Sequence, residues 1–242
     1  MEHWDTLCPH GLKIAYDEHC FPPGTDSFLL SSLPTLKAGL KVCDLGCSTG
    51  LLGILLLQRE RNIHVTGLEL DPAAAALGQR CSAENGLGDT LRILQGDLRE
   101  VKTLFPTGSF DLCICNPPYY GQASGKVSAA LGSARSEVTC TLEDVCAAAK
   151  YLLRWGGSFC IVHKPERLTD LLCALRAHAM EPKKLRFVQK NAASAPSLVL
   201  CEGRRGGKSG LTVLPPLFLE TENGHPTPEL NTIYFRKEDS PT

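Results

Sequence analysis

Residues 41–57, KVCDLGCSTGLLGILLL, decide the fold because they join a short buried strand to a helix through a glycine-bearing turn. Lys41 to Leu45 has the length and apolar character of a strand in a parallel sheet, and Leu51 to Leu57 has those of a buried helix. The turn from Gly46 to Gly50 supplies the glycines that an abrupt change of direction favours. A strand that passes directly into a helix is the repeating unit of α/β domains, so this stretch predicts an α/β fold.

The same alternation continues toward the C-terminus. Further strands are expected at residues 63–68, 91–95, 110–115, 158–162, 184–189 and 198–201. Helices are expected from Asp71-Pro72 onward, from the cap Thr141 through Leu153 with a stop at Gly156-Gly157, and from Arg167 to His178. Together with the first strand, these segments predict a mostly parallel seven-stranded sheet with helices on both faces.

The composition indicates a chain with a hydrophobic core and without a net positive charge that would attract a polyanion. Hydrophobic residues make up 43% of the 242 residues, which is too much for a disordered chain. The formal net charge of −1 means that any nucleic acid must be met by local basic patches. No apolar run approaches the roughly 20 residues that span a bilayer, and the first residues lack a signal-peptide pattern. We therefore expect a soluble, cytoplasmic protein.

Twelve cysteines raise the question of a metal site, but no CxxC pair is present. Five of them lie inside apolar runs, where a free thiol packs as a small hydrophobe: Cys43, Cys113, Cys115, Cys160 and Cys201. The seven histidines do not show the HExxH spacing of a zinc site. The sequence predicts buried thiols and no metal.

Three acidic residues end successive predicted strands. Asp44 enters the glycine turn, whose backbone N–H groups we expect to face a polar or anionic ligand. Glu69 follows the second strand, where a carboxylate can accept hydrogen bonds from two ribose hydroxyls, and Asp97 follows the third, where it can receive an adenine amino group. Because ligands of open α/β sheets bind at the carboxyl ends of the strands, the trio predicts an adenosine-containing cofactor.

Asn116-Pro117-Pro118-Tyr119 follows the fourth strand and suits methyl transfer to a planar nitrogen. The lone pair of such a nitrogen is delocalised, and two carbonyl acceptors, from the Asn116 side chain and the Pro117 backbone, would favour its localisation during attack. Proline supplies a rigid carbonyl without a competing N–H, and Tyr119 offers a flat face for stacking. Catalysis of this kind depends on positioning and electrostatics.

These motifs resemble those of class I S-adenosylmethionine methyltransferases, and more narrowly the bacterial tRNA1(Val) adenine-N6 methyltransferase family. The features that narrow the resemblance are Gly24-Thr25-Asp26 with Leu29-Leu30, Asn116 to Tyr120, Ala134-Arg135 with Glu137, the segment from Gly206 to Leu211, Pro215 to Leu217, Pro228 to Leu230 and Ile233-Tyr234. The resemblance implies a Rossmann-like class I methyltransferase fold, S-adenosylmethionine as cofactor with S-adenosylhomocysteine as product, and an adenine of tRNA(Val) as acceptor.

The same resemblance implies roles for individual residues. Contacts to the cofactor are expected from Asp44, Gly46, Gly50, Glu69 and Asp97, with Asp26 near its methionine end. The catalytic motif would comprise Asn116, Pro117, Pro118 and Tyr119, and Arg135 would contact RNA. Ser48 departs from the family, which often has glycine there, and a positive φ at this position would strain a serine.

A tRNA substrate needs cations for its phosphates. Arg204, Arg205 and Lys208 lie together in one glycine-rich segment and are the preferred candidates. A second group surrounds the sixth strand: Lys183, Lys184, Arg186 and Lys190. Gly207-Lys208-Ser209 does not make a nucleotide-binding P-loop, because the required upstream glycine would fall at Glu202.

Three regions are expected along the chain. Residues 1–39 form an N-terminal extension carrying the Gly24-Thr25-Asp26 segment, 40–203 the methyltransferase core, and 204–242 a basic glycine-rich segment and tail that packs on or near the core. The stretch 121–136 is longer than an ordinary connection and is expected to form a substrate-facing lid. The tail after Glu238 is expected to be disordered, and the protein to be a monomer.

The residues alone leave the acceptor open. Guanine N2 in RNA, adenine N6 in DNA and a protein glutamine amide all present a planar nitrogen. Release-factor glutamine methyltransferases resemble this core preceded by a helical domain, whereas only about 40 residues precede the first strand here. A cofactor-binding module that recognises RNA without turnover is the alternative from a different class.

Overall fold

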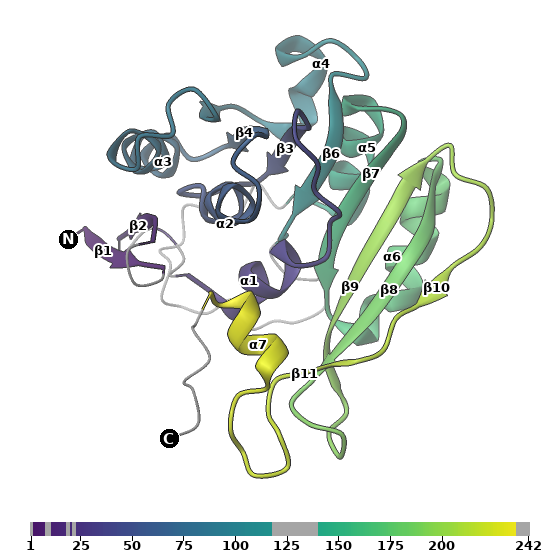
Figure 1. Cartoon of the computed structure of the whole chain (residues 1–242). Coiled ribbons are helices and arrows are strands. Elements are labelled where there is room, and N and C mark those ends of the chain that lie inside the picture. The colour runs from purple at the N-terminus through teal and green to yellow at the C-terminus, as the bar shows by residue number, and fades with distance from the viewer. Residues whose placement is uncertain (1, 8–10, 18–19, 21–22, 118–139, 236–242) are drawn as a thin grey trace, which may run out of the picture.

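A nine-stranded, mostly parallel sheet forms the centre of the molecule (Figure 1). The structure, a computed structural model, describes residues 2–7, 11–17, 20, 23–117 and 140–235. The strand order in the central sheet is β10-β8-β9-β7-β6-β3-β4-β5, with β11 also paired to β8. The seven long strands are β3 (Lys41–Leu45), β4 (His64–Glu69), β5 (Leu91–Gln95), β6 (Phe110–Cys115), β7 (Leu153–His163), β8 (Met180–Gln189) and β9 (Pro196–Arg205). Only β9 runs antiparallel to its neighbours β7 and β8.

All seven predicted strands are present, and the predicted α/β class is confirmed. The sheet nevertheless has two strands more than expected, β10 (Thr212–Val213) and β11 (Leu217–Phe218), which add to the edge at β8. Each contains two residues, too few to produce a hydrophobic pattern that the sequence could reveal.

Helices cover both faces of the sheet, as predicted (Figure 1). On one face lie α1 (Thr25–Ser31), α2 (Leu51–Arg59) and α3 (Pro72–Glu84), and on the other α4 (Val101–Leu104), α5 (Leu142–Leu152) and α6 (Leu168–Ala177). Successive residues of a strand point to opposite faces, so Val42 packs with the first group and Cys43 with the second. The alternation explains why these strands are apolar throughout.

The predicted helices are present, with bounds that differ from the predicted ones by one or two residues, whereas the predicted start of β7 is wrong. Asp71 caps α3 by accepting N–H bonds from the first turn, and Thr141 caps α5 in a reciprocal pair with Asp144. The helix α5 ends at Leu152 rather than Leu153, and β7 begins at Leu153 rather than Ser158. Leu153 pairs with Phe110 of β6 and its carbonyl accepts a bond from the Arg205 guanidinium, so pairing extends the strand back across the glycines.

The first and last segments that the structure describes, before residue 17 and up to residue 235, pack against the core; the tail after Glu238 lies outside the described residues. The hairpin of β1 (His3–Thr6) and β2 (Lys13–Tyr16) reaches α3, where the backbone of Lys13 bonds twice with the Asn85 side chain. Near the other end, α7 (Pro228–Ile233) lies beside α1, with the Tyr234 and Phe28 rings stacked 4.3 Å apart. Arg186 of β8 holds α7 through both oxygens of Glu229, at 2.6 and 2.8 Å.

The five cysteines predicted to be buried are at most 1% exposed. Burial raises the pKa of Cys115, and it raises the pKa of Cys201 to about 12, so these thiols stay protonated. Within the described ranges, no set of three or more His, Cys, Asp or Glu side chains is arranged to hold a metal ion. None of the described helices has the length and hydropathy needed to cross a membrane.

Candidate cofactor and substrate site

The register of four adjacent parallel strands brings the predicted site residues to one edge of the sheet. Asp44 of β3 is level with Gly67 of β4 and with Ile114 of β6. Glu69, the last residue of β4, is level with Gln95 of β5. The carboxyl ends of β6, β3, β4 and β5 therefore present Asn116, Asp44, Glu69 and Asp97 in that spatial order.

The glycine turn between β3 and α2 is held by β4. Gly46, Ser48 and Gly50 all have positive φ, at 74°, 48° and 90°. The N–H groups of Gly46 and Cys47 donate to the Leu68 carbonyl at 2.9 and 3.2 Å, and that of Ser48 donates to Glu69 Oε2 at 2.8 Å. The expectation that the backbone N–H groups of the turn face the ligand is wrong for Gly46, Cys47 and Ser48, because their N–H groups donate hydrogen bonds to the end of β4.

Ser48 carries the backbone strain that its departure from glycine implies. Ser48→Gly is expected to raise the free energy of unfolding by about 1 kcal/mol, since glycine adopts a positive φ without a steric cost. Ala179, between α6 and β8, has a φ of 55° and provides a matched variant away from this edge. Thermal unfolding of Ser48→Gly and Ala179→Gly should show a higher Tm for both, and a lower Tm for Ser48→Gly alone would mean that its side chain stabilises the turn.

Asp44 is a buried carboxylate that lacks hydrogen-bonding partners. Its side chain is 1% exposed, and neither oxygen has a partner within hydrogen-bonding geometry. Burial, and secondly the negative charge of Glu69, raise the pKa of Asp44 to about 8, while the Gly53 N–H at the start of α2 acts in the opposite direction. A side-chain Cβ at Gly46 would meet no atom within 4 Å, so the turn is open next to this carboxylate. The site therefore suits a ligand that brings hydrogen-bond donors or positive charge.

Glu69 is oriented by two backbone amides. Ser48 N–H donates to one oxygen at 2.8 Å and Asp71 N–H to the other at 2.9 Å. Each carboxylate oxygen has a second lone pair, so a carboxylate fixed in this way retains acceptor sites for a pair of hydroxyl groups.

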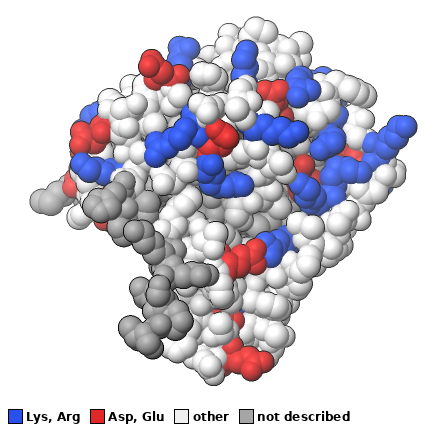
Figure 2. Space-filling view, in the orientation of Figure 1, with Lys and Arg blue, Asp and Glu red and all other residues white. Residues whose placement is uncertain are grey.

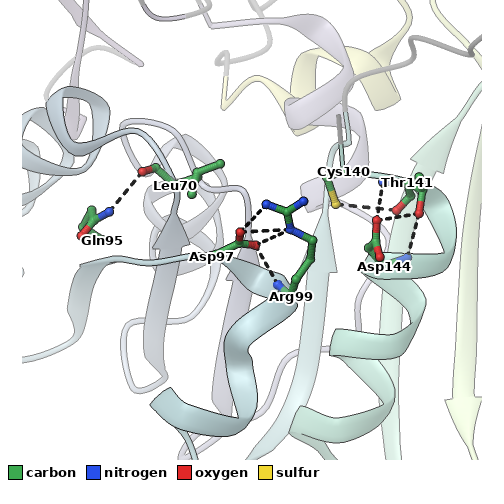
Figure 3. A network of polar contacts seen from close by, with 7 residues as sticks. All are labelled: Leu70, Gln95, Asp97, Arg99, Cys140, Thr141 and Asp144. Atoms are coloured by element: carbon green, nitrogen blue, oxygen red, sulfur yellow. Dashed lines mark hydrogen bonds and ion pairs between the residues drawn. The ribbon is translucent and has the colours of Figure 1, made fainter. Parts of the chain in front are cut away.

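Asp97 is engaged by Arg99 (Figure 3). Arg99 donates to it through its backbone N–H, Nε and Nη2, the last at 2.5 Å, and this pairing lowers the pKa of Asp97. Figure 3 shows Arg99 between Asp97 and the residues that open α5, Cys140 and Thr141. Asp97 is thus an ionised acceptor whose direction is set by Arg99.

Asn116 is held from α1. Its Nδ2 donates to Ser27 Oγ at 3.0 Å, and Ser27 is 9% exposed. The bond connects two segments 89 residues apart and brings the first turn of α1, which contains Asp26, beside the end of β6. Pro117 is buried at the same strand end. Pro118, Tyr119, Arg135 and the expected lid at 121–136 lie outside the described residues.

The predicted RNA-binding cations lie at the other end of the strands. Arg204 of β9 pairs with Ser158, which is level with Leu112, four residues before Asn116 on β6. Arg205 uses one donor on the Leu153 carbonyl, and Lys208 accepts a bond from Lys183 Nζ at 3.1 Å through its own carbonyl. Each remaining member of the second predicted group faces a carboxylate: Lys184 with Glu202, Arg186 with Glu229 and Lys190 with Glu220.

Three residues of this edge were missed by the sequence interpretation. Ser27 and Arg99 hold predicted site residues, and Leu70, directly after Glu69, exposes 44% of an apolar side chain beside them. Two of the three carry a signal in the sequence. Arg99 lies two residues after Asp97, a spacing at which a tight turn brings the side chains together, and Leu70 directly follows Glu69, the residue predicted to bind the ribose. Ser27 carries no signal, because its partner is known only from the fold.

The chain is similar to known methyltransferases. Residues 19–179 match the family model of the methyltransferase small domain. The tRNA1(Val) (adenine(37)-N6)-methyltransferase of Dickeya chrysanthemi is 31% identical over 203 residues, which are 83% of this chain and 79% of that protein. A predicted O-methyltransferase from Agrobacterium tumefaciens has a TM-score of 0.73 at 20% identity, over 87% of this chain and 96% of that one. A geranyl diphosphate methyltransferase solved with S-adenosylmethionine has a TM-score of 0.54 at 20% identity, over 74% of this chain and 84% of that one.

Proposed function

Because the chain belongs to the methyltransferase small domain family, and within it to the family of the tRNA1(Val) (adenine(37)-N6)-methyltransferases, we propose that it methylates N6 of an adenine in tRNA(Val). It is an S-adenosylmethionine-dependent enzyme with the class I methyltransferase fold. The observation that carries the proposal is the alignment of Asp44, Glu69 and Asn116 at the ends of adjacent strands. The proposal places the protein in the cytoplasm as a monomer that uses no metal.

The residues at this edge fit S-adenosylmethionine. Asp44, buried and without a hydrogen-bonding partner, would compensate its positive charge, and Asp26 would lie toward its methionine end. Glu69 would accept hydrogen bonds from the ribose hydroxyls and Asp97 one from the adenine amino group, and the turn, which is open at Gly46, would admit the nucleoside. The cofactor would supply a methyl group on a sulfonium sulfur, electrophilic enough to react with a neutral amino nitrogen, with S-adenosylhomocysteine as the leaving group and one amino proton released to solvent after transfer.

Asn116 would prepare the acceptor nitrogen. Its Nδ2 donates to Ser27, and its Oδ1, the only acceptor atom of the amide, is assigned to one N–H of the adenine amino group. The Pro117 carbonyl is assigned to the second N–H, and Tyr119 to stacking on the base. Two fixed acceptors would draw the lone pair out of conjugation as attack begins, so the protein contributes orientation and electrostatic stabilisation.

Ser27 is expected to position Asn116. Ser27→Ala should lower kcat about 10-fold with little change in the KM for tRNA, because the amide loses the bond that fixes its rotamer. Ser27→Thr retains the hydroxyl and should restore most of the activity. A Ser27→Ala variant with wild-type kcat, or a Ser27→Thr variant that is equally impaired although folded, would remove this role.

Transfer of a labelled methyl group tests the proposal against its alternatives. Bulk tRNA from a strain lacking this protein, duplex DNA and a glutamine-containing protein substrate are each incubated with the enzyme and labelled S-adenosylmethionine. Label is expected on tRNA. Label on protein or DNA alone would contradict the proposed acceptor, and S-adenosylmethionine binding without transfer to tRNA would identify a binding module.

A further inference from the structure

Trp155, near the start of β7, is a large apolar side chain that the fold leaves mostly exposed to solvent. It is 72% exposed, and a side chain of this size gains about 1.5–3 kcal/mol when it is buried. One part of the ring nevertheless packs against the backbone. The ring rests on Gly206, where an added Cβ would come within 2.2 Å of Trp155 Cζ2, and the φ of Gly206 is +66°. The backbone thus supports a large aromatic surface and leaves it in water.

Basic residues precede this ring in sequence and lie on the neighbouring strand and the turn after it. Arg154 adjoins it in sequence and is 58% exposed, and Arg204, two residues before Gly206, is 51% exposed. Lys183 Nζ reaches the Lys208 carbonyl at 3.1 Å, which brings both lysines to the same turn. We call Arg154, Trp155, Lys183, Arg204 and Lys208 the Trp155 patch. Figure 2 shows Lys and Arg spread over the upper part of the molecule, where β9 ends in Figure 1, with Asp and Glu among them, while the lower part around α7 has few Lys and Arg.

Carboxylates only partly neutralise the patch. Arg154 pairs with Asp111, but the nearest oxygen of Glu202, Oε1, lies 3.9 Å from Arg204 and also accepts the closer bond of Ser158, while Lys184 donates to the other oxygen. An exposed aromatic ring among such cations is the arrangement by which proteins bind unpaired bases and the phosphates beside them. The carboxylates of an acidic protein would bind the basic side chains but would not stack on the Trp155 ring, whereas a nucleic-acid base would.

We propose that the Trp155 patch is a second RNA contact of the enzyme, in which Trp155 stacks on an unpaired base and Arg204 and its neighbours bind the adjacent phosphates. The inference rests on the proposed tRNA substrate and extends it. The base bound here is not the one that is methylated, because Trp155 lies between Leu153 and Ser158, which are level with Phe110 and Leu112, six and four residues of β6 before Asn116, or roughly 13–20 Å. The substrate must therefore extend from one end of the strands to the other.

This distance predicts that the patch distinguishes a full-length tRNA from a fragment. A short anticodon stem-loop can place its target base at Asn116 without reaching Trp155. Trp155→Ala is expected to weaken binding of full-length tRNA roughly tenfold, the size of one lost base stack, and to leave stem-loop binding unchanged. Trp155→Phe retains a stacking face and should recover most of the affinity.

Binding measured by fluorescence anisotropy tests the proposal without depending on methyl transfer. Arg204→Ala should reduce the slope of log K against log salt for full-length tRNA by about one, the share of one phosphate contact. Arg80→Ala is the matched control, because Arg80 is an equally exposed arginine on α3, beyond the opposite edge strand β5. In a Trp4→Phe background Trp155 is the only tryptophan, and its fluorescence should be quenched by full-length tRNA.

The outcomes separate this proposal from the proposed activity. Loss of tRNA affinity in Trp155→Ala supports the patch even if methyl transfer to tRNA is not observed. Methylation of tRNA with unchanged affinity in Trp155→Ala and Arg204→Ala overturns the patch and leaves the activity standing. Equal weakening of stem-loop binding, or a change of oligomeric state in place of RNA affinity, also overturns it.

Discussion

Replacing Asn116 with alanine is expected to lower kcat for tRNA methylation by about 10²- to 10³-fold while leaving the affinity for S-adenosylmethionine unchanged. The variant removes the Oδ1 acceptor assigned to the adenine amino group. The charged groups at the neighbouring strand ends remain, and these are the residues proposed to bind the cofactor. Steady-state kinetics with tRNA and calorimetric titration with S-adenosylmethionine measure the two effects separately.

The titration also checks that the Asn116→Ala variant is folded. Asn62→Ala is the matched control, because Asn62 is an exposed asparagine in the turn before β4. Full activity in Asn116→Ala would remove the proposed role of this amide. Loss of cofactor binding together with activity would instead place Asn116 in the cofactor site.

Asp44 is expected to make both stability and cofactor affinity depend on pH. Its pKa is raised to about 8 in the folded protein from an ordinary value of 3.8, so between these values the folded state holds a proton that the unfolded state lacks. Its contribution to the free energy of unfolding therefore falls as pH rises through this interval and is constant above it. From pH 6 to pH 8 the cofactor-free protein should lose about 2 kcal/mol relative to Asp44→Asn, as measured by urea unfolding.

The affinity for S-adenosylmethionine should show the opposite trend. Binding a cation favours the ionised carboxylate, so affinity should rise from pH 6 to pH 8 and level off above, with release of a proton on binding. Calorimetry in buffers of different ionisation enthalpy measures this proton. Asp44→Asn should bind more weakly and without this pH dependence, whereas a wild-type affinity that is flat over the same range would contradict the assignment of Asp44.

The sequence predicts those site residues whose positions follow from the pairing of parallel strands. Asp44, Glu69, Asp97 and Asn116 each lie at or just after the carboxyl end of a strand that its apolar pattern identifies, and parallel pairing brings these strand ends together. The Nδ2–Oγ bond from Asn116 to Ser27 depends on how α1 packs, and no local pattern carries that information. The hairpin of β1 and β2 was not predicted for the same reason, because its position depends on contacts with α3.

Two errors arose where tertiary pairing overrides a local signal. The glycines at 156 and 157 mark a helix stop in sequence, yet β7 runs through them because Leu153 pairs with β6. The glycine turn was expected to offer its N–H groups to the ligand, yet Leu68 and Glu69 accept them. RNA binding by the segment from Arg204 to Lys208 stays a prediction, and antiparallel β9 places this segment at the end of the strands away from Asn116.

Mapping the modified nucleoside tests the central claim most directly. Bulk tRNA from a strain that lacks this protein is incubated with the enzyme and S-adenosylmethionine, digested, and analysed by mass spectrometry. The account predicts N6-methyladenosine at a single position of one tRNA, at a level that Asn116→Ala strongly reduces. A methylated guanine in the tRNA, or tRNA that stays unmodified while a protein glutamine gains the methyl group, would contradict it.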